Sequence, residues 1–256
     1  MTLRARATSS SRQRIVAAYS SKSKNSKSKA SATATKRQMA VINWENVLVP
    51  LGWMMTHLGL GTSTSTIDLK DIQSQSQCLA ELPSTFAAIE DEILELLTVT
   101  MRSVKGPVFI VSEYPTVYVE FVCYLFFPRL TAALRSATTG IYVVGTPDTQ
   151  LNDSELNLWK VNLLRTMVLE RVFANVSAND AANPTSGRLD VFALCATKVD
   201  VAAMSTLHSD APYSIVKSVR VKTGAIGLGD FYRQLQTLTQ FVKQAVAANY
   251  PMNVDL

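Results

Sequence analysis

The chain has 256 residues, 47% of them apolar, with 25 Lys and Arg against 20 Asp and Glu, which gives room for one sizeable core or two small ones. Three widely separated cysteines and two isolated histidines exclude a disulfide scaffold and a zinc module, and they indicate reduced, buried thiols. The longest apolar run, residues 117–127, falls short of the roughly 20 residues that span a bilayer. We therefore expect no transmembrane segment, and one domain with a tail.

The positive charge is concentrated at the N-terminus. Residues 1–40 hold ten of the Lys and Arg residues and no Asp or Glu, so residues 41–256 carry 15 basic and 20 acidic side chains. The segment is rich in Ser, Thr and Ala and offers too little apolar surface to offset the entropy of folding. The sequence therefore predicts a disordered basic tail over residues 1–38 and a folded, mildly acidic domain over residues 39–256.

Several interpretations of the tail remain open. Its Arg-containing, hydroxyl-rich first half resembles a mitochondrial transit peptide, whereas the Ser/Lys alternation from Ser20 to Lys29 is typical of a solvated linker. A third interpretation is an arm that binds nucleic acid or an anionic membrane surface. The lysines alternate with Ser instead of clustering, which makes this arm the weaker pattern. The expected location is mitochondrial, with the cytoplasm or nucleus as the alternative.

In the body, strand-like and helix-like segments alternate. The β-branched apolar run 39–49 predicts a first strand, which the turn residues Pro50 and Gly52 end. Helices are predicted at 82–101, 117–134, 153–173 and 231–248, and further strands at 107–111, 141–144, 189–194 and 215–221. This alternation predicts an α/β fold: a Rossmann-like layered, mostly parallel sheet with helices on both faces.

In such sheets, ligands bind at the carboxyl ends of the strands. The first strand is followed by Asn43-Trp44-Glu45, the second by Ser112, and the fourth by Cys195-Ala196-Thr197. Lys160 lies on the helix that precedes the fourth strand. These positions are therefore the candidates for chemistry.

The order and spacing of these residues resemble the haloacid dehalogenase (HAD) superfamily of phosphohydrolases. The closest pattern is that of a eukaryotic-microbial branch whose first motif reads Asp-Trp-Asp-Asp-Thr-Leu, where this chain reads Asn-Trp-Glu-Asn-Val-Leu from residue 43. The resemblance covers residues 41–245 and implies a HAD-like domain without a large cap. In that family the first Asp attacks phosphorus, the Asp two residues later is the general acid/base, and an acid after strand four binds Mg²⁺. A Ser or Thr and a downstream Lys hold the phosphoryl oxygens.

Carried over to this chain, the resemblance implies a degenerate site. Asn43 replaces the nucleophile, Glu45 replaces the acid/base, and Ala196 replaces the metal-binding acid. An amide is a far poorer nucleophile than a carboxylate, and alanine offers no metal ligand. Ser112 and Lys160 match the phosphate-binding pair, so the resemblance implies at most a remnant anion site, with no catalytic residues and no metal cofactor.

Three functions follow as hypotheses. The first is a noncatalytic HAD-like pseudophosphatase that binds a protein partner or has a structural role. The aromatic-rich segment 117–127 favours a partner surface, because its aromatics exceed what one buried stripe needs. The second is a Mg²⁺-dependent phosphatase with atypical residues, in which Glu45 or Asp200 supplies the carboxylate. The third is a protein that uses its basic tail on RNA or on a membrane surface.

Overall fold

The computed structural model divides the chain into two units, Met1–Thr33 and Ala34–Leu256. It describes residues 37–60, 82–136, 140–147, 151–167, 189–210, 214–221 and 226–256, all in the second unit. The interpretations of the tail as an import, linker or polyanion-binding segment therefore lie outside the described residues. The first strand begins at Arg37, two residues before the expected domain boundary at Met39.

Six parallel strands form one sheet in the order β3-β2-β1-β4-β5-β6. Their bounds are β1 Arg37–Asn43, β2 Val108–Ser112, β3 Ile141–Gly145, β4 Leu189–Cys195, β5 Ile215–Arg220 and β6 Met252–Asp255. The central strands β1, β2 and β4 are buried along their length, apart from the first two residues of β1, as expected for a parallel sheet covered on both faces. The predicted Rossmann-like α/β fold is confirmed.

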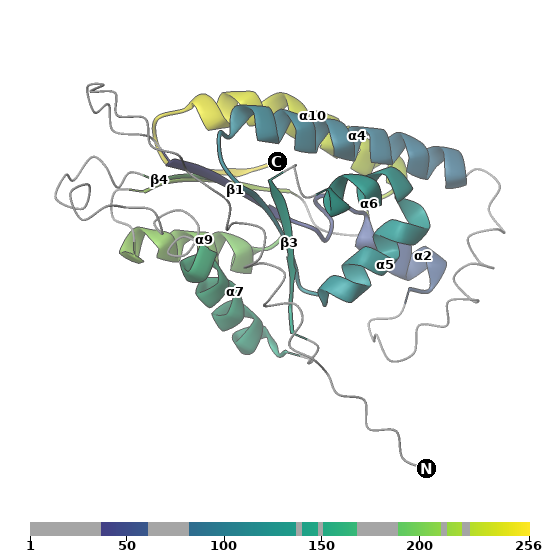
Figure 1. Ribbon diagram of the computed structural model, residues 1–256, viewed down its shortest axis with the longest axis horizontal. Coiled ribbons are helices and arrows are strands. Elements are labelled where there is room, and N and C mark those ends of the chain that lie inside the picture. The colour runs from purple at the N-terminus through teal and green to yellow at the C-terminus, as the bar shows by residue number, and fades with distance from the viewer. Residues whose placement is uncertain are drawn as a thin grey trace, which may run out of the picture. The chain divides into compact units, whose positions relative to one another are not determined.

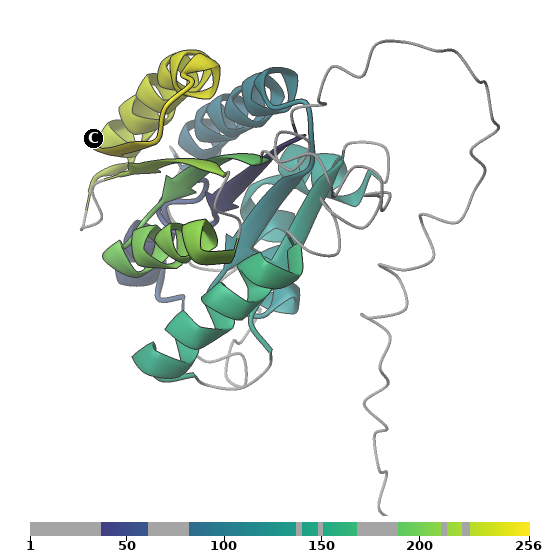
Figure 2. The same cartoon turned by 90° about the vertical axis from the view of Figure 1, so that its left-hand side faces the viewer.

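Seven helices lie in the described part of the chain. Their bounds are α2 Leu51–Leu58, α4 Leu82–Ser103, α5 Thr116–Phe126, α6 Pro128–Arg135, α7 Asp153–Met167, α9 Lys198–Asp210 and α10 Leu228–Ala247. Helices α4 and α10 pack side by side on one face of the sheet, and α7 and α9 pack together on the other (Figures 1 and 2). The sheet is thus the middle of three layers.

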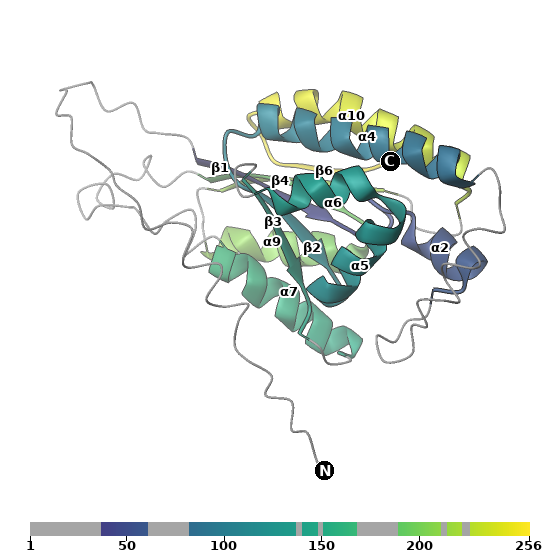
Figure 3. The same cartoon turned by 45° about the vertical axis from the view of Figure 1, so that its right-hand side comes forward.

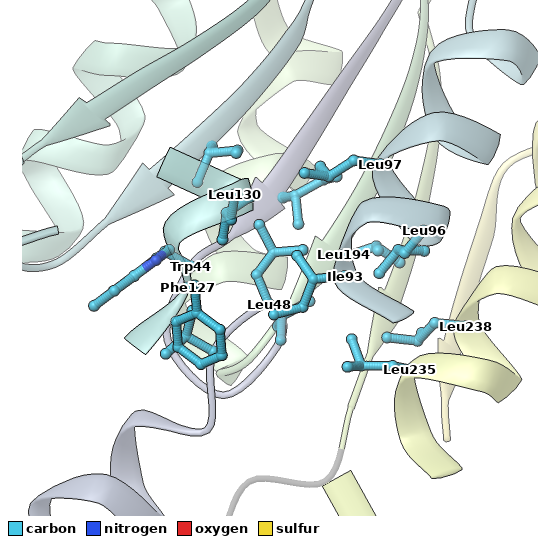
Figure 4. Packing of buried hydrophobic residues seen from close by; sticks show 14 of the residues in the cluster. Trp44, Leu48, Ile93, Leu96, Leu97, Phe127, Leu130, Leu194, Leu235 and Leu238 are labelled. Atoms are coloured by element: carbon cyan, nitrogen blue, oxygen red, sulfur yellow. The ribbon is translucent and has the colours of Figure 1, made fainter. Parts of the chain in front are cut away.

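The larger core lies between the sheet and the α4–α10 layer. Side chains from the loop after β1 meet those of α4, α10, α6 and β4 there, as Figure 4 shows for Trp44, Leu48, Ile93, Leu96, Leu97, Phe127, Leu130, Leu194, Leu235 and Leu238. Trp44 and Leu48 are fully buried. The loop that follows β1 is therefore fixed by the core, and with it the polar residues that neighbour Trp44.

The first strand is shorter than predicted. It ends at Asn43, and the chain then turns back on itself, because the N–H groups of Leu48 and Val49 both donate to the carbonyl of Trp44. Asn46 adopts the left-handed conformation that this turn needs, with φ of 57°. Helix α2 follows where only a turn was expected. In its first turn, the N–H of Gly52 donates a hydrogen bond to Asn46 Oδ1.

Other boundaries also differ. The helix predicted over 117–134 is two helices, because Pro128 lacks the N–H that a continuous helix needs and starts α6 instead. Helix α9 and the short edge strand β6 were not predicted. Cys123 and Cys195 are free and buried, as expected, and Cys78 lies outside the described residues. Within the described ranges, no helix combines the length and apolarity needed to cross a membrane.

We expect Gly106→Ala to destabilise the fold by about 1–3 kcal/mol. A β-carbon at this position, between α4 and β2, would lie 1.8 Å from the backbone carbonyl oxygen of Gln38 in β1. The chemical-denaturation midpoint measures the effect. Gly229→Ala in α10 is the matched control, since a β-carbon there meets nothing within 4 Å. Equal midpoints for the two variants would contradict the close approach of the α4–β2 connection to β1.

Candidate functional site

The predicted site residues meet at the carboxyl edge of the sheet, where the chain order reverses. Strand β1 has β2 on one side and β4 on the other, so the connections leaving β1 and β4 diverge and open a crevice. A small pocket lies there between the sheet and helices α7 and α9. Its polar lining comes from Asn43, Lys160 and Asp200, and the rest is mainly aliphatic, with Cys195.

Lys160 is the central charge of this site. Its side chain is buried, with 3% of its surface exposed, and its Nζ donates to Glu113 Oε1 at 2.5 Å and to Asp200 Oδ1. Burial alone would lower the pKa of Lys160, but the carboxylates of Asp200 and Glu113 outweigh it and hold the pKa above its ordinary value. The ammonium therefore stays charged and joins α7 to the segments after β2 and β4.

Asp200 is engaged on both of its oxygens. While Oδ1 accepts from Lys160, Oδ2 accepts from the backbone N–H groups of Ala196 at 3.0 Å and Thr197 at 2.7 Å, and from Thr197 Oγ1 at 3.0 Å. The N–H of Asp200 in turn donates to Thr197 Oγ1 at 3.2 Å. This reciprocal pair is a capping box that starts α9. It is also how Ala196 joins the site, through its backbone and not its side chain.

Glu45 ties the loop after β1 to the end of β2. Its Oε1 accepts from Ser112 Oγ at 2.5 Å and from the N–H of Glu113 at 2.8 Å, while Asn43 Nδ2 lies 3.4 Å from Oε2. Burial raises the pKa of Glu45 to about 7, and the charge of Glu113 adds to the rise, although the bond from Ser112 opposes it. Glu45 therefore changes its protonation near neutral pH.

Aromatic rings stand next to this carboxyl group. Tyr114 and Tyr118 stack with their ring centroids 4.8 Å apart, and Trp44 meets Tyr118 edge-on at 6.3 Å. The N–H of Tyr114 donates to Ser112 Oγ at 3.0 Å, so this hydroxyl is shared between Glu45 and the turn after β2. Burial raises the pKa of Tyr114 to about 12, with help from the charges of Glu45 and Glu113.

The structure therefore brings Asn43, Glu45, Ser112, Lys160 and the backbone of Ala196 into one connected network. Of its other members, Glu113 and Thr197 follow the predicted strands but were given no role from the sequence, and Asp200 was considered only as a substitute carboxylate. The Thr197-x-x-Asp200 spacing is a capping-box signal that could have located both α9 and Asp200. No comparable signal marks Glu113, because its role depends on a lysine 47 residues away.

These residues do not fit a Mg²⁺ site. Hard cations prefer several carboxylate or carbonyl oxygens in one place, but position 43 carries an amide, position 196 a methyl group, and Asp200 already accepts four hydrogen bonds. Among the described residues, no three His, Cys, Asp or Glu side chains are grouped so that they could hold a metal ion.

An anion also meets competition at this edge. Both residues expected to bind an anion already donate to carboxylates: Ser112 donates to Glu45, and Lys160 donates to Glu113 and Asp200. Glu113 and Asp200 both contact the single ammonium of Lys160, so the local charge is already negative, and an ionised Glu45 makes it more negative. An incoming phosphate would have to displace an internal carboxylate from Lys160 and remain beside it.

The chain matches no protein-family model, and comparisons with curated proteins and with solved structures find no similar protein.

We expect Glu45→Gln to flatten the pH dependence of stability. The pKa of Glu45 is about 7 in the folded protein against an ordinary 4.5, so between these values the folded state keeps a proton that the unfolded chain has released. The contribution of Glu45 is therefore fully present below about pH 4.5 and is lost as the pH rises through about 7. The loss amounts to roughly 3 kcal/mol in the free energy of unfolding.

Urea denaturation of wild type and Glu45→Gln, from about pH 4 to about pH 8, measures this difference. Glu95→Gln, at an exposed position on α4, is the control and should follow the wild-type curve. Parallel curves for wild type and Glu45→Gln would mean that Glu45 titrates in its ordinary range.

Proposed function

We propose that this protein is a noncatalytic, HAD-like α/β module with a binding or structural role. The observation that carries the proposal is the internal ion pairing of Lys160 with Glu113 and Asp200. These charged groups lie where a phosphohydrolase of this kind would engage phosphate and metal, and here they pair with one another. The ion pairs at the carboxyl edge of the sheet then hold α7 to the segments after β2 and β4, and any binding takes place on other surfaces of the domain.

The residue types at the edge support the same conclusion. Asn43 lies at the end of β1 and lines the pocket. Its amide nitrogen contacts Glu45, and its amide oxygen is a weak nucleophile. Losing one member of a catalytic set commonly costs several orders of magnitude in rate, and losses that act together leave little activity. With Ala196 also lacking a ligand, phosphoryl transfer has neither its nucleophile nor its cation.

One observation favours the second candidate, a phosphatase with atypical residues. A pKa of about 7 on Glu45 suits a general acid/base at neutral pH. Against it, both oxygens of Glu45 face internal donors, and the other candidate carboxylate, Asp200, is committed to capping α9 and pairing with Lys160. This candidate requires Mg²⁺-dependent turnover that Glu45→Gln abolishes.

The triple variant Asn43→Asp, Glu45→Asp, Ala196→Asp tests the proposed origin of the site. If the three positions share one pocket, their carboxylates repel one another there, which lowers the melting temperature in chelator. Because carboxylates in one place suit a hard cation, millimolar Mg²⁺ should restore the melting temperature of the variant. Wild type should show no Mg²⁺-dependent change in melting and no turnover of p-nitrophenyl phosphate.

Thr237→Asp adds a carboxylate to the exposed side of α10 and should respond to Mg²⁺ no more than wild type. If Mg²⁺ leaves the melting of the triple variant unchanged, positions 43, 45 and 196 do not share a pocket and the HAD-like interpretation fails. If wild type turns over the phosphate ester and Glu45→Gln does not, the protein is an enzyme and the second candidate replaces the first.

A further inference from the structure

The pocket at the carboxyl edge of the sheet is small and mainly apolar. Helices α7 and α9 lie along one face of the sheet (Figure 3), and residues of both helices and of β1, β2 and β4 line the pocket. Most of the lining is aliphatic, with side chains such as Val41, Val111 and Leu164. The cavity measures about 20 Å³, and one water molecule needs roughly 10–15 Å³ of such space. The pocket therefore has the size of a site for one water molecule.

Lys160 brings a hydrogen-bond donor to this pocket. Its ammonium has three N–H groups, and in the described part of the chain Glu113 and Asp200 accept from two of them. The side chain of Lys160 is buried, so its third N–H does not face bulk water. A buried donor that makes no hydrogen bond loses the solvation that it had in water. The third N–H of Lys160 therefore needs an acceptor at the pocket that this residue lines.

Asn43 and Asp200 bring acceptors to the same pocket. Both side chains are buried and line it. The amide nitrogen of Asn43 lies 3.4 Å from Glu45 Oε2, so its amide oxygen is directed away from that carboxylate. Among the described residues, Asp200 Oδ1 accepts from Lys160 alone, while Oδ2 takes the donors at the start of α9. A carboxylate oxygen has room for two donors, so one donor and two acceptors line one small cavity.

We propose that this pocket binds one structural water molecule, which accepts a hydrogen bond from Lys160 Nζ and donates to Asn43 Oδ1 and Asp200 Oδ1. Three hydrogen bonds are the usual number for a buried water. Water both accepts and donates, whereas chloride only accepts and a metal cation is repelled by the ammonium. The water joins the end of β1 to α7 and α9. The proposal rests on the cavity and its lining, and it does not depend on the proposed function.

A high-resolution crystal structure of the wild-type chain tests the proposal, with crystals grown with and without inorganic phosphate. It should show one water within about 3.2 Å of Lys160 Nζ, Asn43 Oδ1 and Asp200 Oδ1 in both cases. Asn43→Leu keeps a similar volume but removes one acceptor, and its structure should lack this water. Asn162→Leu makes the same change at an exposed position on α7 and should keep the water.

Urea denaturation supplies a measurement in solution. Asn43→Leu should lower the denaturation midpoint of wild type, because the donor of Lys160 then loses its water. In a Lys160→Met background the same substitution should lower the midpoint less, since that donor is already gone. Equal losses in the two backgrounds would contradict the link through water.

The wild-type structure decides the question even if a variant does not fold. A pocket without density, or a protein acceptor on the third N–H of Lys160, would overturn the water site and leave the proposed noncatalytic role in place. A phosphate ion bound beside Lys160 in the crystals grown with phosphate would overturn the water site and would also contradict the proposed function.

Discussion

A buried ammonium between two carboxylates organises one edge of this protein. Removing Lys160 and Asp200 from water carries a large desolvation cost, which only close pairing and further hydrogen bonds offset. The structure supplies both, since Lys160 reaches both acids and Asp200 accepts three more hydrogen bonds from the start of α9. Because Lys160 lies on α7, this one group joins three segments that the sheet alone would leave separate.

The same pairing accounts for the chemical character of the edge. Crevices at the reversal of strand order arise from backbone topology, so they persist whatever side chains line them. Here the groups that would donate to a ligand donate to the protein's own carboxylates. Lys160 donates to Glu113 and Asp200, and Ser112 donates to Glu45. Glu45 is buried beside Glu113 and aromatic rings, which explains why the pKa of its carboxyl lies near neutrality although Ser112 donates to it. Fold and chemistry are thus separable in this protein.

Much of the fold could be predicted because its strongest patterns are local. The heptad-like apolar spacing of α4 and α10, the β-branched runs of β2 and β3 and the apolar run of β4 are long enough to identify each element. The tight turn at Asn46 and the break at Pro128 shift boundaries, since a left-handed residue and a missing N–H act on a few residues only. Helix α9 mixes polar and apolar residues without a clear stripe, and its capping box is its one distinct signal.

The candidate site was predictable in position but not in contacts. Asn43, Ser112 and Ala196 lie at strand ends, and strand ends of a parallel sheet share an edge. What each side chain does there depends on long-range partners. Glu45 turns toward Ser112, which is 67 residues away, and Lys160 toward acids 47 and 40 residues away. Spacing along the chain carries no information about such pairs.

A double-mutant cycle on Lys160 and Asp200 tests the central interaction most directly. Lys160→Met, Asp200→Asn and the double variant are compared with wild type by their free energies of unfolding. Lys160→Met leaves the buried carboxylate of Asp200 without its cation, and Asp200→Asn leaves the buried ammonium with Glu113 alone. The double variant should therefore lose about 2 kcal/mol less than the sum of the two single losses. The exposed pair of Arg233 and Asp230 is the reference, with an expected coupling below about 0.5 kcal/mol. Losses at Lys160 and Asp200 that add to within about 0.5 kcal/mol would contradict the account.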